Sequence, residues 1–368
     1  MNSNFIKYLN QIVTTIFLAS LLIACKTNKV TVEKNKNSNE VNVYVAGYEY
    51  NDSKFESYIE EMADEVGMKH VVKLWKNGKE IDLEDSNLYS DAESVFVNNK
   101  NDVYAAGSIR PNENYVAAIW KNGKIEKLTD GIKTGHINAI FIEDDNVYAL
   151  GAQYTDKHYA MKVWKNGVCS NITDGKTDVT GNAIFVNKGD IYISGYEKHG
   201  NKYIAKIWKN GKSQNLTDGL TDAFALSLYM DKKDMYVVGY EIVNNKRIAK
   251  VWINGKAQNL SDGSNDAVAR ALCVYKNTIY VVGSQEIKGK DIAVLWINGR
   301  AQNITTGTNR SGANSILVHN DTIYIAGYEE NNAERYIAKL WKNGVATDLT
   351  DGTKNGYAQS LFIEGKKQ

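Results

Sequence analysis

Apolar and polar residues alternate in short stretches along most of the chain, and one stretch recurs at a nearly constant spacing. In the segment from Tyr203 to Trp208 the alternation ends at a tryptophan, and Asn210-Gly211 follows two residues later. A period of two is typical of half-buried β-strands. Asn-Gly tolerates the positive φ angles that a two-residue hairpin turn requires. The stretch therefore predicts a strand that turns directly into an antiparallel neighbour.

All seven tryptophans of the chain occur in this same context. They stand at Trp75, Trp120, Trp164, Trp208, Trp252, Trp296 and Trp341, with gaps of 45, 44, 44, 44, 44 and 45 residues. Each period also holds three more short alternating segments, as in Ala183–Val186, Ile191–Gly195 and Ser213–Leu216. A period of about 44 residues with four strands, here named a to d in chain order, is typical of propeller blades.

The second strand of each period, strand b, carries a tyrosine followed three residues later by a glycine. These glycines are Gly47, Gly107, Gly151, Gly195, Gly239, Gly283 and Gly327. If strands b and c pair in simple register, Gly195 lies opposite Trp208, so that the indole covers a bare backbone position. The same register predicts a cross-strand ion pair between Glu197 and Lys206. We therefore interpret the tryptophans as core residues, in preference to a sugar-stacking surface.

The two ends of the repeat region are complementary. The region opens with a strand b at Val41–Gly47 and ends with an unpaired strand a at Ala358–Ile363. Pairing of these two strands would close a ring and remove its open sheet edge. We predict an all-β fold over residues 41–368: a seven-bladed β-propeller of four-stranded antiparallel blades, in which the C-terminal strand completes the first blade.

The strand b that ends in Gly and the strand c that ends in Trp resemble kelch-type and bacterial seven-bladed propeller repeats. The resemblance covers residues 41 to 368, and the Leu-Thr-Asp-Gly ending of the repeats is also similar to TolB-type propellers. True kelch repeats end strand b with a double Gly, whereas one Gly precedes Tyr196 here. The resemblance implies the architecture, because proteins of this fold serve unrelated functions.

Residues 1–25 have the pattern of a targeting segment. An apolar run from Ile12 to Ile23 leads to Ala24-Cys25, an ending that resembles a bacterial lipobox with Cys25 as the lipid attachment site. The alternative is an ordinary secretory signal. Residues 26–40 are rich in Lys, Asn, Ser and Glu, and predict a flexible tether. We expect a lipoprotein of the bacterial cell envelope, at the outer membrane or cell surface rather than the inner membrane.

The composition excludes several classes of function. The net charge is +1, and no basic block offers the footprint that nucleic acid requires. Cys169 and Cys273 stand at different repeat positions, which predicts two small buried residues and neither a disulfide nor a metal site. We expect no metal, no cofactor, membrane contact through the lipid alone, and a monomer.

Candidate binding residues lie where the blades converge. The position near the start of each strand a is mostly polar and differs between blades. Its residues, here called the ring residues, are Glu93, Asn138, Asn182, Leu226, Arg270, Asn314 and Gln359. We predict that they face the central channel or its mouth as a ligand ring; hydrogen bonding between blades and plain solvation are the alternatives. An insertion between Tyr50 and His70 has apolar residues at helical spacing, which is compatible with a short acidic helix or with a loop.

Catalytic motifs are missing from the sequence. It has no Gly-x-Ser-x-Gly, no His-Glu-x-x-His and no phosphate-binding glycine loop. Glu93 is the only carboxylate among the ring residues, so the paired carboxylates of glycoside hydrolysis are absent there. We expect no catalytic residues and no enzyme, but a binding or protein–protein interaction scaffold for a protein, peptide or glycan. The alternatives are a hydrolase or lyase acting on an extracellular polymer at the channel, and a structural component of the envelope.

Overall fold

Seven four-stranded antiparallel sheets succeed one another along the chain. The computed structural model describes residues 41–50, 70–85 and 89–364. The targeting segment, the tether and the insertion before His70 lie outside the described residues. In each of the seven sheets, consecutive strands of a meander pair with their neighbours. The predicted all-β, seven-bladed fold is confirmed.

Blades 1 to 4 contain the following strands. Blade 1 consists of β28 (Gly356–Glu364), β1 (Asn42–Tyr50), β2 (His70–Lys76) and β3 (Lys79–Ile81). Blade 2 consists of β4 (Tyr89–Val97), β5 (Val103–Arg110), β6 (Val116–Lys121) and β7 (Lys124–Lys127). Blade 3 consists of β8 (Gly135–Glu143), β9 (Asn146–Tyr154), β10 (Tyr159–Lys165) and β11 (Val168–Asn171). Blade 4 consists of β12 (Val179–Asn187), β13 (Asp190–His199), β14 (Lys202–Lys209) and β15 (Lys212–Asn215).

Blades 5 to 7 repeat the same order. Blade 5 consists of β16 (Ala223–Asp231), β17 (Asp234–Val243), β18 (Lys246–Ile253) and β19 (Lys256–Asn259). Blade 6 consists of β20 (Ala267–Tyr275), β21 (Thr278–Ile287), β22 (Lys290–Ile297) and β23 (Arg300–Asn303). Blade 7 consists of β24 (Ser311–His319), β25 (Thr322–Glu330), β26 (Tyr336–Lys342) and β27 (Val345–Asp348).

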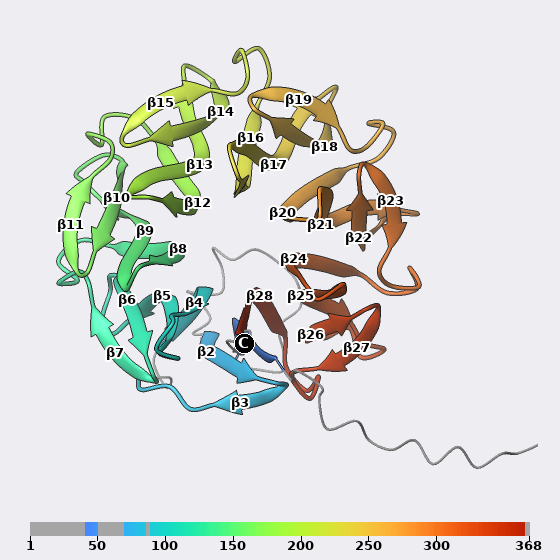
Figure 1. Cartoon of the computed structure of the whole chain (residues 1–368), viewed down its shortest axis with the longest axis horizontal. Coiled ribbons are helices and arrows are strands. Elements are labelled where there is room, and N and C mark those ends of the chain that lie inside the picture. Colours follow the sequence, from blue (N-terminus) through green and yellow to red (C-terminus); the bar gives the residue numbers. More distant parts are fainter. Residues whose placement is uncertain (1–40, 51–69, 86–88, 365–368) are drawn as a thin grey trace, which may run out of the picture. The chain divides into compact units, whose positions relative to one another are not determined.

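The first strand of each blade lies at the inside of the ring, and the fourth lies at the outside (Figure 1). In blade 1 the inner strand is β28, which pairs antiparallel with β1 from Asn42↔Glu364 to Glu49↔Gly356. The C-terminal strand therefore completes the blade that the N-terminal strand begins, as the sequence predicts.

The Asn-Gly turns have the geometry that their sequence predicts. Between β14 and β15, Asn210 and Gly211 have φ values of 49° and 79°, which suit a type I′ turn. The Asn210 side chain also accepts a hydrogen bond from the backbone N–H of Ile191 at 2.8 Å. The corresponding asparagine makes this bond in all seven blades, at 2.8 to 3.0 Å. Each Asn thus ties the c–d turn to the start of strand b.

The predicted pairing of Trp208 with Gly195 is wrong. The β13–β14 hairpin ends at the pair His199↔Lys202, so its register differs by two residues from the simple one. Gly195 lies opposite Lys206, and Trp208 lies opposite Ile193. The ion pair between Lys206 and Glu197 is present all the same, as a diagonal contact. Equivalent pairs join Lys73 to Glu49 at 3.6 Å, Lys250 to Glu241 at 2.5 Å and Lys339 to Glu329 at 3.4 Å.

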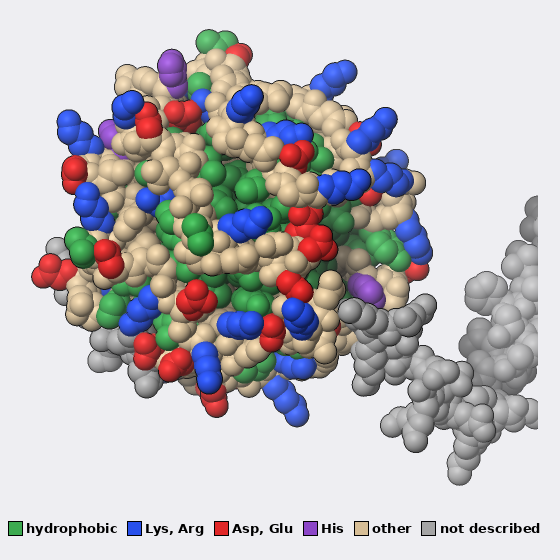
Figure 2. Space-filling view, turned by 60° about the vertical axis from the view of Figure 1, so that its left-hand side comes forward, with side chains coloured by type: hydrophobic (Ala, Val, Ile, Leu, Met, Phe, Trp, Pro, Cys, Tyr) green, Lys and Arg blue, Asp and Glu red, His purple; other side chains and the backbone are tan. Residues whose placement is uncertain are grey.

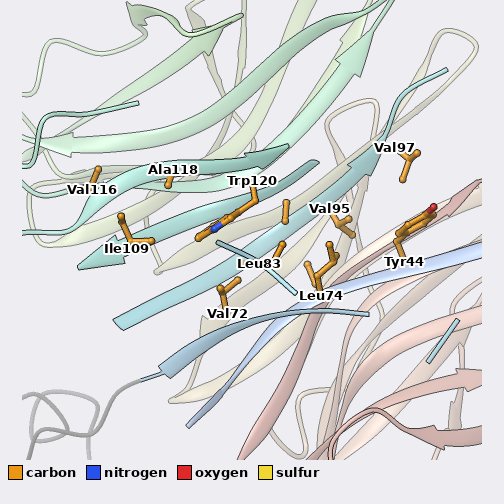
Figure 3. Packing of buried hydrophobic residues seen from close by; sticks show 13 residues of the cluster. Tyr44, Val72, Leu74, Leu83, Val95, Val97, Ile109, Val116, Ala118 and Trp120 are labelled. Atoms are coloured by element: carbon orange, nitrogen blue, oxygen red, sulfur yellow. The ribbon is translucent and has the colours of Figure 1, made fainter. Parts of the chain in front are cut away.

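The tryptophans pack between blades. Seven clusters of buried apolar residues each join two neighbouring blades, and each contains one of the seven tryptophans. In one of them, Trp120 of β6 lies with Val72 and Leu74 of β2 in the preceding blade (Figure 3). All seven indoles are at most 3% exposed. Since a buried tryptophan removes a large apolar area from water, these contacts hold the ring of blades together.

The strand b glycines have a different structural cause. A Cβ on Gly195 would lie 2.0 Å from the carbonyl oxygen of Thr180 on the neighbouring strand a. The same clash would occur at every equivalent glycine, with distances of 1.8 to 2.2 Å to a backbone oxygen. Each glycine faces a β-bulge in strand a, which presses a carbonyl into the space of the missing side chain.

Replacing Gly195 by Ala should therefore destabilise the protein by about 3 kcal/mol or more, because the clash is with backbone rather than a flexible side chain. Gly200→Ala is the matched control. Nothing lies within 4 Å of a Cβ there, and its cost of about 1 to 2 kcal/mol comes from φ = +59° alone. Urea unfolding of the two variants measures the difference. Equal costs at the two positions would contradict the assignment of Gly195 to the bulge.

Candidate functional site

The ring residues are the bulged residues of the inner strands. In β12 the pairing with β13 passes from Gly181↔Gly195 to Ala183↔Ser194, so Asn182 has no partner in the ladder. The register shifts at the corresponding position in every blade. A bulged residue leaves the alternation of the strand and is re-aimed. The bulge is the structural reason that this position differs from its small or apolar neighbours.

The seven ring residues line one cavity, here called the axial cavity, of about 420 Å³. His136 and Thr180 also line it, and each stands two residues before a ring residue. Because strand a begins at the d–a loop, His136 and Thr180 lie nearer to this loop than the ring residues do. They extend the cavity toward the face that carries the b–c and d–a loops. The structure thus brings the seven candidate residues together. That they bind a ligand stays a prediction.

Three ring asparagines form hydrogen bonds between blades. The Nδ2 of Asn138 donates to the carbonyl of Gly181 at 2.8 Å, and the Nδ2 of Asn182 donates to Ala225 at 2.9 Å. Asn314 donates to the carbonyl of Ala358 at 3.0 Å and to the Oε1 of Gln359 at 2.7 Å. Each bond reaches from one inner strand to the next. At these three positions, the hydrogen bonds between blades that were the alternative to a ligand ring are present.

Arg270 has no such structural role among the described residues. Its guanidinium makes no ion pair and no hydrogen bond there, and its Nε is buried without an acceptor. The side chain lies near Tyr240: burial raises the pKa of this phenol, and the positive charges of Arg247 and, to a smaller extent, Arg270 oppose the shift. Burying this Nε–H without an acceptor is costly, since the donor has lost water and gained no hydrogen bond in exchange.

The two charged ring residues lie far apart on the ring. Glu93 belongs to blade 2 and Arg270 to blade 6, which are three blade steps apart along the shorter path. No two positions of a seven-membered ring are further apart. Glu93 is flanked by the polar residues Gln359 and Asn138, whereas Arg270 has the apolar Leu226 on one side. The cavity therefore has a negative sector and a positive sector.

A second circle of side chains, which sequence reasoning missed, lies about 10 Å further along the inner strands. It holds the residues three positions after the ring: Phe96, Phe141, Phe185, Tyr229, Cys273, Leu317 and Phe362. Ring contacts run through five of them, with centroid distances of 4.4 Å for Phe96–Phe362, 5.3 Å for Phe96–Phe141, 4.8 Å for Phe141–Phe185 and 5.9 Å for Phe185–Tyr229. In the sequence, this layer is indicated by aromatic residues that recur three positions after the ring residue in strand a. This layer is an apolar base beneath the axial cavity.

Burial shifts the pKa of two titratable groups on inner strands, Asp91 on β4 and His136 on β8. Burial raises the pKa of Asp91 to about 6, although its hydrogen bonds from the backbone N–H and the hydroxyl of Ser108 favour the carboxylate. Burial lowers the pKa of His136, so this imidazole is neutral at pH 7. Both residues stand two positions before a ring residue.

Other candidate chemistry is spread over the molecule. Lys and Arg side chains are interspersed with Asp and Glu on the face shown in Figure 2. Cys273 is buried as predicted, whereas Cys169 is exposed on the edge strand β11, so its predicted burial is wrong. Within the described ranges, no three His, Cys, Asp or Glu side chains group as metal ligands do. The described part of the chain also holds no helix with the length and apolar character to cross a membrane.

Comparisons with known proteins show similarity in fold. No protein-family model matches the sequence, and no curated protein matches it. Among solved structures, a puromycin-hydrolysing peptidase from Mycobacterium tuberculosis has a TM-score of 0.53 at 10% identity over 76% of this chain, which spans 50% of that protein's length. A protein described as TolB from Agrobacterium tumefaciens has a TM-score of 0.43 at 12% identity, over 67% of this chain and 95% of that one.

A third similar structure is the extracellular domain of a hybrid two-component system protein from B. thetaiotaomicron. Its TM-score is 0.49 at 10% identity, over 77% of this chain and 38% of that one. Of the three scores, the one for the peptidase exceeds 0.5, and at 10% identity it shows the fold alone. The kelch-like character of the repeats stays a prediction.

The expectation that the chain is not an enzyme is corrected by this comparison. The peptidase has a similar fold and hydrolyses puromycin, so the propeller architecture does not exclude catalysis. Catalytic motifs of local spacing do not report residues that different blades bring together. In a propeller, side chains from all blades meet at the axis at separations of about 44 residues.

The raised pKa of Asp91 predicts a stability that depends on pH. Because the folded state holds the proton up to about pH 6 and the unfolded state loses it near pH 4, stability should fall as the pH rises through this window, by about 2 to 3 kcal/mol. Asp91→Asn should remove this fall, and urea unfolding between pH 4 and 7 measures it. The exposed Asp82→Asn is the control. An unchanged pH profile for Asp91→Asn would count against the assignment.

Proposed function

We propose that this chain is a lipid-anchored protein of the bacterial cell envelope that acts as a binding scaffold, with its ligand in the axial cavity. The ligand, part of a protein, a peptide or a glycan, would enter from the face of the b–c and d–a loops. Function commonly lies on loops and clefts that a rigid scaffold displays. The protein would work as a monomer and would touch the membrane through its lipid.

The observation that carries this proposal is the guanidinium of Arg270, which lines the cavity without an acceptor among the described residues. Three other ring positions are explained by the bonds they make between blades. Arg270 makes no such bond, and a leucine or an asparagine at this position would spare the protein a charged group with a buried donor that has no acceptor. An anionic group of a ligand would compensate that charge.

The size of the cavity supports a small ligand or the end of a longer one. Its volume of about 420 Å³ lies within the range of about 300 to 1,000 Å³ that is usual for small-molecule sites. The lining residues are half-buried, so they are accessible to a ligand and still partly fixed by their neighbours. A site with one residue from each blade can recognise a ligand from all sides.

The Glu93→Ala/Arg270→Ala double variant should lose at least tenfold in affinity for the ligand, because it removes both charges of the cavity. The wild-type protein is first screened against glycans, peptides and amino acids by thermal shift, and hits are measured by calorimetry. The Glu126→Ala/Arg300→Ala variant, with both changes on exposed outer strands, is the control. Unchanged binding in the first variant would rule out the axial cavity as the site.

The anchor has its own test, at Cys25. If this thiol carries the lipid, Cys25→Ser should move the protein from the membrane fraction to the soluble fraction, because the variant lacks the lipid through which the protein contacts the membrane. Fractionation followed by immunodetection measures the change, and Cys169→Ser, at an exposed cysteine within the propeller, is the control. Retention of the Cys25→Ser protein in membranes would argue for another mode of attachment.

A further inference from the structure

We infer that the axial cavity recognises a small zwitterion whose charges stand at its two ends, such as a dipeptide, with its ammonium group toward blades 2 to 4 and its carboxylate on Arg270. This inference rests on the proposed function and narrows the ligand to one chemical class. It follows from the arrangement of donors and acceptors around the ring.

The orientation of two ring amides is fixed by their partners. Asn138 and Asn182 each approach a backbone carbonyl of the next blade, and a carbonyl oxygen can only accept. Each side chain must therefore present its Nδ2 to the backbone, which leaves its Oδ1 as an acceptor. Throughout the part of the chain that the structure describes, no donor bonds to either Oδ1.

These two oxygens lie in the same sector as a carboxylate. Glu93, Asn138 and Asn182 come from the consecutive blades 2, 3 and 4, and all three line the cavity. The Glu93 carboxylate has two oxygens and can accept from more than one donor. The sector thus offers acceptors from three side chains and one negative charge. An ammonium group has three N–H donors and one positive charge, whereas a sugar hydroxyl donates a single hydrogen and carries no charge.

The opposite sector offers donors. Arg270 provides a planar guanidinium that pairs with a carboxylate through two parallel hydrogen bonds. Its ring neighbour Leu226 has no polar group, and Asn314 directs its Nδ2 to Ala358 and Gln359. The positive charge of this sector therefore resides on Arg270 alone among the ring residues. A carboxylate bound here would satisfy a guanidinium that the described part of the protein leaves without an acceptor.

The separation of the two sectors determines the orientation in which the ligand binds. Glu93 and Arg270 are three blade steps apart, so one small molecule can meet both only if its charges stand at opposite ends. A simple anion would use Arg270 and place its other end against acceptors. A simple cation would leave the guanidinium without a partner. A zwitterion presents a charge of the opposite sign to each sector.

Calorimetry with a matched set of probes tests the inference on the purified full-length chain. The probes are alanyl-alanine, its N-acetyl form without the ammonium group, its C-terminal amide without the carboxylate, galacturonate and inorganic phosphate. We expect alanyl-alanine to bind, and acetylation or amidation each to weaken binding at least tenfold.

Variants assign each end of the ligand. Arg270→Gln should weaken alanyl-alanine and make binding insensitive to amidation, and Glu93→Gln should make it less sensitive to acetylation. Arg270→Lys keeps the charge but loses the planar pair of donors, and should give an intermediate affinity. Arg300→Gln, an exposed change of the same type on β23, should leave all affinities unchanged. Circular dichroism of each variant verifies that the propeller is folded.

The outcomes separate this inference from the proposed function. Binding of galacturonate or phosphate that depends on Arg270, without binding of alanyl-alanine, would overturn the zwitterion and leave the cavity as the site. Equal affinity for alanyl-alanine and its blocked forms would also overturn it. Alanyl-alanine binding that neither Arg270→Gln nor Glu93→Gln alters would refute both the inference and the proposed site, and no binding of any probe would refute the inference.

Discussion

One steric constraint connects the scaffold of this protein with its cavity. In every blade, a carbonyl oxygen of the inner strand lies 1.8 to 2.2 Å from where a Cβ of the second strand's glycine would stand. The bulge that places this carbonyl also releases the residue two positions later from the strand ladder and turns it to the axis. Glycine on one strand and a free side chain on its neighbour are thus two consequences of one backbone arrangement. For this reason the glycine is the same in every repeat while the ring residue differs.

The contacts that hold the ring together are distributed unevenly around it. Buried tryptophans join all seven pairs of neighbouring blades. Hydrogen bonds from ring asparagines add to three of these joints, and the hydroxyls of Ser94, Ser315 and Ser360 accept backbone N–H groups of the next blade at 3.1 to 3.2 Å. Among the described residues, no inner-strand bond of these kinds follows Leu226 or Arg270. The sector that contributes least to this bonding is the one that carries the charge without an acceptor.

The sequence predicts the blades, their number and their closure because these depend on local alternation, on Asn-Gly turns and on a fixed period. It also locates the ring residues, since a variable polar position among apolar neighbours is visible without coordinates. The predicted pairing of Trp208 with Gly195 is wrong because a register shift of two residues keeps every side chain on the same face of the sheet. The alternation of apolar and polar residues therefore cannot distinguish the two registers. The role of Arg270 is equally invisible, because acceptors missing from its surroundings are a property of the folded ring. The aromatic layer leaves a signal in the sequence, since an aromatic residue recurs three positions after the ring residue in five of the seven inner strands.

The closure of the ring by β28 ties the completeness of the fold to the completeness of the cavity. Gln359 belongs to this last strand, and its Oε1 accepts a hydrogen bond from Asn314 across the joint between blades 7 and 1. A ring that opens at this joint therefore loses a wall of the cavity as well as an edge strand. A ligand that binds only to the closed cavity therefore stabilises the joint between blades 7 and 1. By mass action, its free energy of binding adds to the free energy needed to open the ring. Binding of a ligand in the cavity and closure of the ring are thus thermodynamically linked.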